Sequence, residues 1–362
     1  MVVHDVHRAC APRAGVRAGF EAQPGVTETY GGNQSPRGRN PAVGQAAVEV
    51  KATMENVHML APAAGRRADV LEVVGSAGHL AGAVSREPLG GRAIGVVVSS
   101  RMTPERGRTL DAIASAAAAE GYAITLIPVA CPMHAAASAA FQWLGELAVD
   151  GVVVLADECV DWSEIESPRG VPVVIVGANP GAGKAVVDVD IDHVQGVAVA
   201  VEHLLGLGHE TVWHIAGPTH SFAAACRERA WRETLLRFDR AVPLPVVGDW
   251  SAEAGYTLGQ LLGRDQAVTA VFAANDRMAL GLLRALREAG RAVPGEISVV
   301  GFDDVADAAW FSPSLTTVRQ SFDELGGRAV RALLDAMSGR PMVPSLVPVT
   351  LVVRGSTGPS PW

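Results

Sequence analysis

Acidic side chains stand at the ends of several apolar runs in this sequence, where they are placed to bind or to catalyse. Asp190 and Asp192 close one such run, and the pair Asp303 and Asp304 closes another. Paired carboxylates perform general acid–base chemistry, and they equally accept hydrogen bonds from the hydroxyl groups of a ligand. No G-x-S-x-G turn accompanies them, and no serine or cysteine lies near a histidine at a helix–strand junction. The acids therefore favour ligand binding, and the chain is not expected to be an enzyme.

A glycine-rich stretch from Asn179 to Lys184 shares some features with a phosphate-binding P-loop. That loop requires a glycine separated from Gly-Lys by four residues, and a serine or threonine after the lysine to hold Mg²⁺. This chain has Ala178 and Ala185 at those two positions. We interpret the stretch as a turn between two strands, and no nucleotide cofactor is expected.

His203, His209 and His214 lie close enough in sequence to suggest a metal site. No cysteine or carboxylate completes the set at the spacing that metal ligands adopt. Their positions within a helical segment, just after Gly208, and within an apolar run predict three separate structural roles. No metal site is expected.

Composition restricts the class of protein. The chain has 362 residues, of which 49% are hydrophobic, and a net charge of −8. This length predicts two domains at about 150 residues each, and the acidic balance disfavours non-specific coating of nucleic acid. The four cysteines form no C-x-x-C pair, so neither a zinc site nor a disulfide framework is expected. The sequence contains no membrane-spanning apolar stretch and no signal peptide, which predicts a cytoplasmic protein.

From Ile94 to Arg354, short apolar runs alternate with longer segments of helical period. The runs cover residues 94–98, 123–127, 152–155, 173–176, 211–215, 270–273 and 297–300. Continuous apolar runs are typical of parallel strands covered by helices on both faces. Four runs precede Asp192 and three follow it, which predicts two α/β lobes. Because ligands bind beyond the carboxyl ends of such strands, we expect the site in a cleft between the lobes.

Residues 1–91 have a different character. Residues 1–40 are rich in Gly, Pro, Arg and Asn and are expected to be largely disordered. A helical pattern begins at Pro41, and a second, shorter helix is predicted from Arg66 to Val74.

Several motifs in the second half of the chain are similar to those of one family. Residues 268–281, VTAVFAANDRMALG, strongly resemble the LacI/GalR family of bacterial transcription regulators. The similarity continues through LREAG and ISVVGFDD in 286–304, SLTTVRQ in 314–320 and LVVRGST in 351–357, and EHLLGLGH (202–209) and IAGP (215–218) fit it upstream. Because these motifs recur in order and spacing, the resemblance is specific; it covers about residues 92–357.

The resemblance implies an α/β periplasmic-binding-protein-like (type I) fold with two Rossmann-like lobes. It implies a first lobe of residues 92–191 and 320–340 and a second of residues 192–319 and 341–357, preceded by an irregular N-terminal segment, residues 1–91. Family members form dimers, bind sugars or nucleobases in the cleft, and bind operator DNA through an N-terminal module. A homodimer that binds a sugar-like effector is therefore expected.

The resemblance also implies effector-binding residues. Trp250 would offer an aromatic face to a sugar ring, Asn275 would supply a donor and an acceptor, and Asp303 would accept from hydroxyl groups. Gln320 lies at a crossover between the lobes, and we add Asp192 from the acids that end the apolar runs.

Two positions depart from the family pattern. The family usually has an arginine seven residues after the proline of its Gly-Pro motif, and this chain has Ala225 there. Arg227 lies two residues further on, rotated by about 200° around a helix, and is not expected to substitute for it. The family aspartate after the fourth strand is Gly177 here. These losses predict a ligand smaller or less polar than a hexose, or one held weakly.

The N-terminal segment departs further. No run in residues 1–91 matches the helix-turn-helix of the family, and Pro88 would break a hinge helix. We therefore predict weak operator binding by a degenerate DNA-binding region. Two functions stay open: a LacI/GalR-type regulator that controls operator DNA, and a ligand-binding protein or regulator remnant without DNA-binding activity.

Overall fold

The computed structural model describes residues 92–99, 103–129, 149–155, 170–177, 186–341 and 343–362. The predicted N-terminal helices, the disorder expected in residues 1–40 and the glycine-rich turn at 179–184 lie outside these residues. Within the described residues, no helix is long and apolar enough to cross a membrane.

Six strands form the first sheet. They are β1 (Ala93–Ser99), β2 (Ala123–Val129), β3 (Gly151–Leu155), β4 (Val173–Val176), β5 (Val186–Ile191) and β11 (Ser345–Val347). Their spatial order is β11-β5-β4-β3-β1-β2, and every neighbouring pair is parallel. Strands β3 and β4 are buried along their whole length, which explains why they read as unbroken runs of Val, Ile and Leu.

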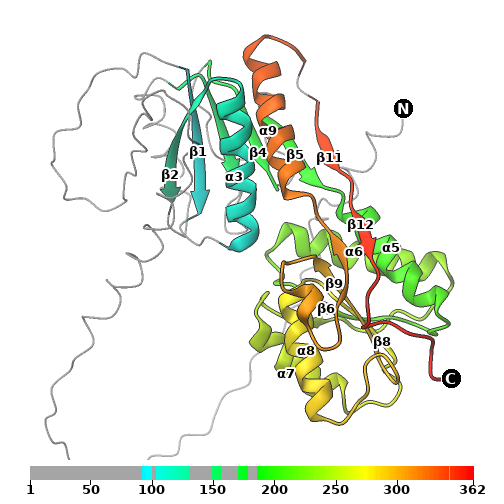
Figure 1. Cartoon of the computed structure of the whole chain (residues 1–362). Coiled ribbons are helices and arrows are strands. Elements are labelled where there is room, and N and C mark those ends of the chain that lie inside the picture. The colour runs from blue at the N-terminus through cyan, green and yellow to red at the C-terminus, as the bar shows by residue number, and fades with distance from the viewer. Residues whose placement is uncertain (1–91, 100–102, 130–148, 156–169, 178–185, 342) are drawn as a thin grey trace, which may run out of the picture. The chain divides into compact units, whose positions relative to one another are not determined.

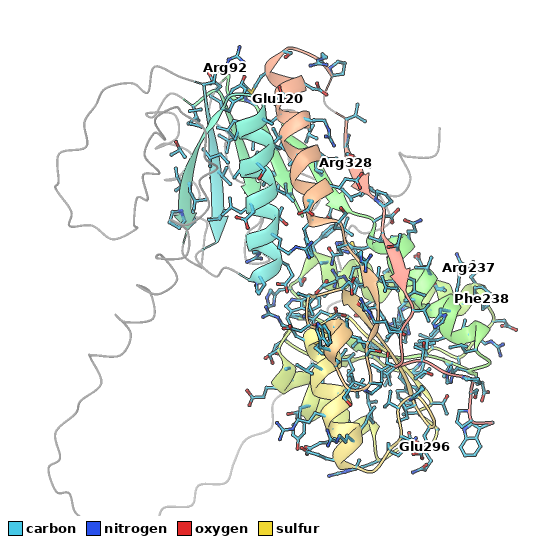
Figure 2. The ribbon with its side chains drawn as sticks, in the orientation of Figure 1. Arg92, Glu120, Arg237, Phe238, Glu296 and Arg328 are labelled. Atoms are coloured by element: carbon cyan, nitrogen blue, oxygen red, sulfur yellow. The ribbon has the colours of Figure 1, made fainter. Side chains whose placement is uncertain are left out.

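Helices α3 (Pro104–Ala119) and α9 (Phe322–Met337) pack side by side against this sheet (Figure 1). Gly326 permits their close approach, since a Cβ there would lie 2.6 Å from the Cβ of Ala112. Arg328 of α9 reaches toward β11 (Figure 2) and donates to Ser345 Oγ and to the Leu346 carbonyl, both at 2.9 Å. Although they come late in the sequence, β11 thus belongs to the first sheet and α9 packs on it.

The second sheet contains β6 (Trp213–Ala216), β7 (Val246–Val247), β8 (Ala270–Ala273), β9 (Ser298–Asp303), β10 (Thr316–Arg319) and β12 (Thr350–Val352). Its order is β12-β10-β9-β8-β6-β7. The pairs from β10 to β7 are parallel, whereas β12 is antiparallel to β10.

Helices cover both faces of this sheet. They are α5 (His193–Gly206), α6 (Phe222–Arg237), α7 (Ala252–Leu262) and α8 (Asp276–Glu288), and a 3-10 turn, η3, spans Ala308–Trp310. Phe272 and Phe302 pack with the buried residues of α5 and α6, whereas Val271 and Val299 pack with those of α7 and α8. This alternation follows from the two-residue period of a strand.

The chain passes between the sheets three times: from β5 to α5, from β10 to α9, and from β11 to β12. The Asp192 backbone N–H donates to the Val347 carbonyl at 2.9 Å, so the first and third crossovers lie side by side. Because Ser345–Val347 pairs with β5, the third crossover follows residue 347 rather than residue 340, where we expected the first lobe to end.

The predicted fold class, two α/β lobes with parallel sheets, is confirmed. All seven predicted strands are present. Within the described residues, five further strands lie outside those seven runs: β5, in which aspartates interrupt the apolar pattern, and the short β7, β10, β11 and β12.

Candidate functional site

Asp303 is the last residue of β9 and lies at the carboxyl end of the second sheet. Its Oδ1 accepts from Gln320 Nε2 and lies 3.5 Å from Arg227 Nη1. Burial raises the pKa of the Asp303 carboxyl to about 7, because lost hydration outweighs the stabilising charge of Arg227. Asp303 has a φ of 113°, a value that non-glycine residues adopt rarely. The backbone of Asp303 therefore has an unusual conformation, and its carboxylate lies among polar partners.

Arg227 projects from the buried face of α6 and is itself 5% exposed. Its guanidinium lies 3.8 Å from the centroid of the Phe302 ring and 5.6 Å from that of Trp250. Nη1 donates to the Ala274 carbonyl, and Nε donates to His193 Nδ1 at 3.4 Å. Arg227, which was not expected to substitute for the family arginine, lies beside Asp303 because the buried face of α6 faces the end of β9. Ala225 is the exposed position.

Trp250 and Asn275 form a unit beside Arg227. Asn275 is the N-cap of α8: its Oδ1 accepts from the Met278 N–H at 2.9 Å, and its Nδ2 donates to the Trp250 carbonyl at 3.1 Å. Trp250 has a φ of 74°, and its ring lies over Gly217, where a Cβ would approach it to 2.3 Å. The helix cap thus supports the strained loop residue that presents the indole.

The two crossover residues have different surroundings. Gln320, between β10 and α9, is 6% exposed and contacts Asp303 directly. Asp192 is the N-cap of α5, where its Oδ1 accepts from the Gln195 N–H at 2.8 Å. Trp250, Asn275, Asp303 and Gln320 therefore form one connected group through Arg227 and the Trp250 carbonyl, while the Asp192 side chain caps its own helix.

Asp276 lies beneath this group with no exposed surface. It accepts from Thr317 Oγ1 at 2.5 Å and from the Val305 N–H at 2.9 Å. Burial, assisted by the neighbouring Asp303, raises the pKa of its carboxyl well above the ordinary value. Gly301 makes room for it, since a Cβ there would lie 2.2 Å from Asp276 Oδ1. Asp276 therefore links β10 to the loop that follows β9.

The three histidines have separate partners. His203 Nε2 bonds to Thr357 Oγ1, His209 bonds to the Thr269 and Ser298 hydroxyls, and His214 Nδ1 bonds to the Phe272 carbonyl, all at 3.0 Å. Among the described residues, no group of three or more His, Cys, Asp or Glu side chains is arranged to hold a metal ion.

Comparison with known proteins places this chain in a family. Residues 201–357 match the model of a periplasmic-binding-protein-like domain. The lactose operon repressor of Klebsiella pneumoniae is 41% identical over 173 residues, which are 47% of this chain and 49% of the repressor. The match thus spans about half the length of that repressor. A repressor of Proteus mirabilis, HTH-type transcriptional repressor PurR, is 31% identical over 253 residues, 67% of this chain and 73% of that protein. This chain belongs to the LacI/GalR family.

Solved structures of LacI/GalR regulators have the same fold. A lac repressor dimer bound to operator and the anti-inducer ONPF has a TM-score of 0.67 and 31% identity, covering 74% of this chain and 94% of that one. A complex of the transcriptional regulator CelR with cellobiose has a TM-score of 0.64 and 30% identity, covering 74% and 85%. The relatives are named as repressors and regulators, so the family is one of regulators and not of enzymes.

Two residues of this connected group, Arg227 and His193, were not among the expected site residues. The signal for Arg227 was present in α6, because positions 224, 227, 231 and 235 recur at helical spacing and are all buried. His193 follows the N-cap Asp192 directly, and nothing in its spacing relates it to Arg227.

Proposed function

We propose that this chain is a LacI/GalR-type transcriptional regulator. Its core binds a sugar-like effector in the cleft that the family resemblance implies, and the bound effector alters the affinity for operator DNA. The observation that most supports this proposal is the connected group at the end of β9, which contains Trp250, Arg227, Asp303 and Gln320. An aromatic face beside a charged acceptor suits the C–H surface and the hydroxyl groups of a sugar.

The departures from the family pattern bear on which effector fits. Ala225 is exposed and lacks a polar group, and Gly177 has a φ of 78°, which a larger residue would adopt only with strain. Arg227 supplies a cation 3.5 Å from Asp303, but it is only 5% exposed. We propose an effector smaller or less polar than a hexose, bound chiefly through Trp250, Asn275, Asp303 and Gln320, with Asp192 beside the first crossover.

A ligand-binding remnant without DNA-binding activity is the second candidate. The absence of a family helix-turn-helix run from residues 1–91 favours it, because the recognition helix of that module reads the operator. Both candidates share the same effector core, so only DNA binding separates them.

Two measurements on the purified full chain test the proposal. Thermal unfolding with a panel of pentoses, hexoses and cellobiose should identify a ligand that raises the melting temperature, since a ligand bound to the native state stabilises it. Selection of DNA from a random duplex library at physiological salt should enrich one palindromic sequence if the chain is a regulator. Sub-micromolar, ligand-sensitive binding to that sequence would support the regulator and overturn our prediction of weak operator binding. Ligand binding without enrichment would support the remnant.

We further propose a homodimer that forms through the outer surface of α8 and η3. Leu280 of α8 is 42% exposed, and Trp310 of η3 is 85% exposed. Exposed apolar side chains of this size are typical of protein interfaces. We propose that a second copy of the chain covers this surface, in agreement with the dimeric lac repressor structure.

A further inference from the structure

The tail of the chain, residues 356–362, follows β12 along the second lobe (Figure 1). Its first residue, Ser356, is completely buried and is bonded to two strands of the second sheet. The Ser356 carbonyl accepts from the Val299 N–H of β9, and its Oγ accepts from the Thr316 N–H of β10, both at 2.8 Å. Because none of these groups is titratable, this anchor of the tail does not depend on pH.

Beyond this anchor, the tail is held by two histidines and a serine. His203 Nε2, on α5, bonds to Thr357 Oγ1 at 3.0 Å. His209 Nε2 lies 3.0 Å from Ser298 Oγ and 3.2 Å from the Gly358 carbonyl. Ser298 Oγ in turn accepts from the Gly358 N–H at 3.0 Å and donates to its carbonyl at 3.1 Å. We call this set of contacts around Thr357 and Gly358 the tail clasp.

The contacts of His209 suit a neutral ring. A carbonyl only accepts, so the Nε2 that faces Gly358 carries a proton. In the neutral ring Nδ1 is then an acceptor, and Thr269 Oγ1 donates to it at 3.0 Å. A second proton on Nδ1 would point at the Thr269 hydroxyl and would place a positive charge on a ring that is 1% exposed. Burial of a charge without a counter-ion is costly, so the closed clasp disfavours this proton.

The surroundings of both rings supply hydroxyl groups, and Thr357 itself contacts Thr316 Oγ1 at 3.1 Å. In the part of the chain that the structure describes, neither ring forms an ion pair with a carboxylate. The charged side chains of the neighbouring segments are paired elsewhere or exposed: Glu202 pairs with Arg237, Glu296 with Arg291 and Arg354 with Asp304, and Glu210 is exposed. Burial lowers the pKa of both histidines below the ordinary value of 6.5, and a charge on His203 also lowers that of His209.

We infer that His203 and His209 make the clasp an acid-sensitive device that releases residues 357–362 from the second lobe while Ser356 stays anchored. In the released tail both rings return to water, so opening takes up one or two protons. The closed clasp is therefore fully stable above pH 6.5 and loses stability as the pH falls below that value. Release also uncovers the Ser298 hydroxyl, which is completely buried in the closed state. The inference depends on neither the effector nor DNA.

Hydrogen exchange of the ligand-free full chain between pH 5 and pH 8, followed by mass spectrometry, tests the clasp. Exchange rates are divided by the intrinsic rate at each pH, so that protection of the Gly358 and Ser360 amides reports opening. Below pH 6.5 this protection should fall by about 10- to 100-fold per pH unit, since each proton taken up contributes a factor of about ten. The Val299 amide, bonded to Ser356, should stay protected, which would distinguish release of the tail from unfolding of the sheet.

The double variant His203→Gln with His209→Gln keeps an amide near each Nε2 position but takes up no proton. Protection of its tail amides should not depend on pH, and each single variant should retain about a tenfold change per pH unit. His214→Asn is the matched control, because His214 is also a buried histidine of the second lobe but bonds to the Phe272 carbonyl. This variant should leave the pH dependence of the tail amides unchanged.

Two results would overturn the inference. One is equal protection of the tail amides at pH 5 and pH 8 in the unchanged chain, a result that needs no variant to fold. The other is a folded double variant whose tail amides have the same pH dependence as those of the unchanged chain.

Discussion

Asp303 is the side chain that we expect to accept hydrogen bonds from the hydroxyl groups of the ligand. Replacing it with alanine leaves the donors of a bound ligand without their acceptor, so Asp303→Ala should weaken binding of the best sugar by about 5- to 150-fold. Isothermal titration calorimetry on the full chain measures this change. Asp307→Ala is the control, because Asp307 is exposed and caps η3 without a side-chain hydrogen bond. Equal affinities in the two variants and the unchanged chain would place the ligand elsewhere.

His214 gives the molecule a sensitivity to acid. It stacks on Phe272 at 4.9 Å, and its Nε2 has no hydrogen-bond partner among the described residues. Burial lowers the pKa of His214 to about 4, so the native state excludes a proton that the unfolded chain binds below pH 6.5. Stability is therefore fully present above pH 6.5 and falls toward pH 4, by about 3 kcal/mol in total.

Chemical unfolding across this pH range checks the prediction. His214→Asn keeps a donor for the Phe272 carbonyl but cannot take up a proton, so its pH profile should lack that part of the slope. The cavity it leaves lowers stability by the same amount at every pH. A slope equal to that of the unchanged chain would show that other groups cause the acid sensitivity.

At the scale of elements, α7 and α8 approach so closely that two glycines are required. A Cβ at Gly281 of α8 would lie 1.9 Å from the Ala252 carbonyl, and one at Gly255 of α7 would lie 2.1 Å from the Met278 carbonyl. Gly281→Ala should destabilise the chain by several kcal/mol, about the cost of a badly overpacked core. Gly206→Ala, in the last turn of α5, meets no atom within 4 Å and should be tolerated. Thermal unfolding of both variants checks the contrast.

The sequence predicted elements well where burial is continuous and poorly where it is not. Strands such as Val173–Val176 can be predicted directly from their unbroken apolar sequence, because both faces of the strand are buried. Val186–Ile191 did not, since Asp188 and Asp190 break its apolar pattern although both are buried. Of the connected group, the family motifs indicated Asp303 and Gln320, whereas the helical spacing of α6 indicates Arg227 only once the buried face of that helix is known, which is a tertiary property.

At the scale of the whole molecule, the proposed dimer makes a prediction for Leu280. A charged side chain on an apolar interface loses its hydration without gaining a partner. Leu280→Arg should therefore convert the dimer to a monomer at tens of micromolar, as measured by light scattering. Leu236→Arg, at a position 61% exposed on α6, should leave the dimer intact. A monomeric unchanged chain, or equal effects of both variants, would contradict the proposed surface.

The late position of β11 has a consequence for how the chain is made. β5 ends at Ile191, yet its outer neighbour begins at Ser345. At about 5 to 20 residues per second, the ribosome leaves β5 as an open strand edge for on the order of ten seconds. Open edges pair with other chains, and charges on them oppose this. Asp188 and Asp190, which obscure the strand in the sequence, are thus placed to protect the nascent first sheet from aggregation until β11 arrives.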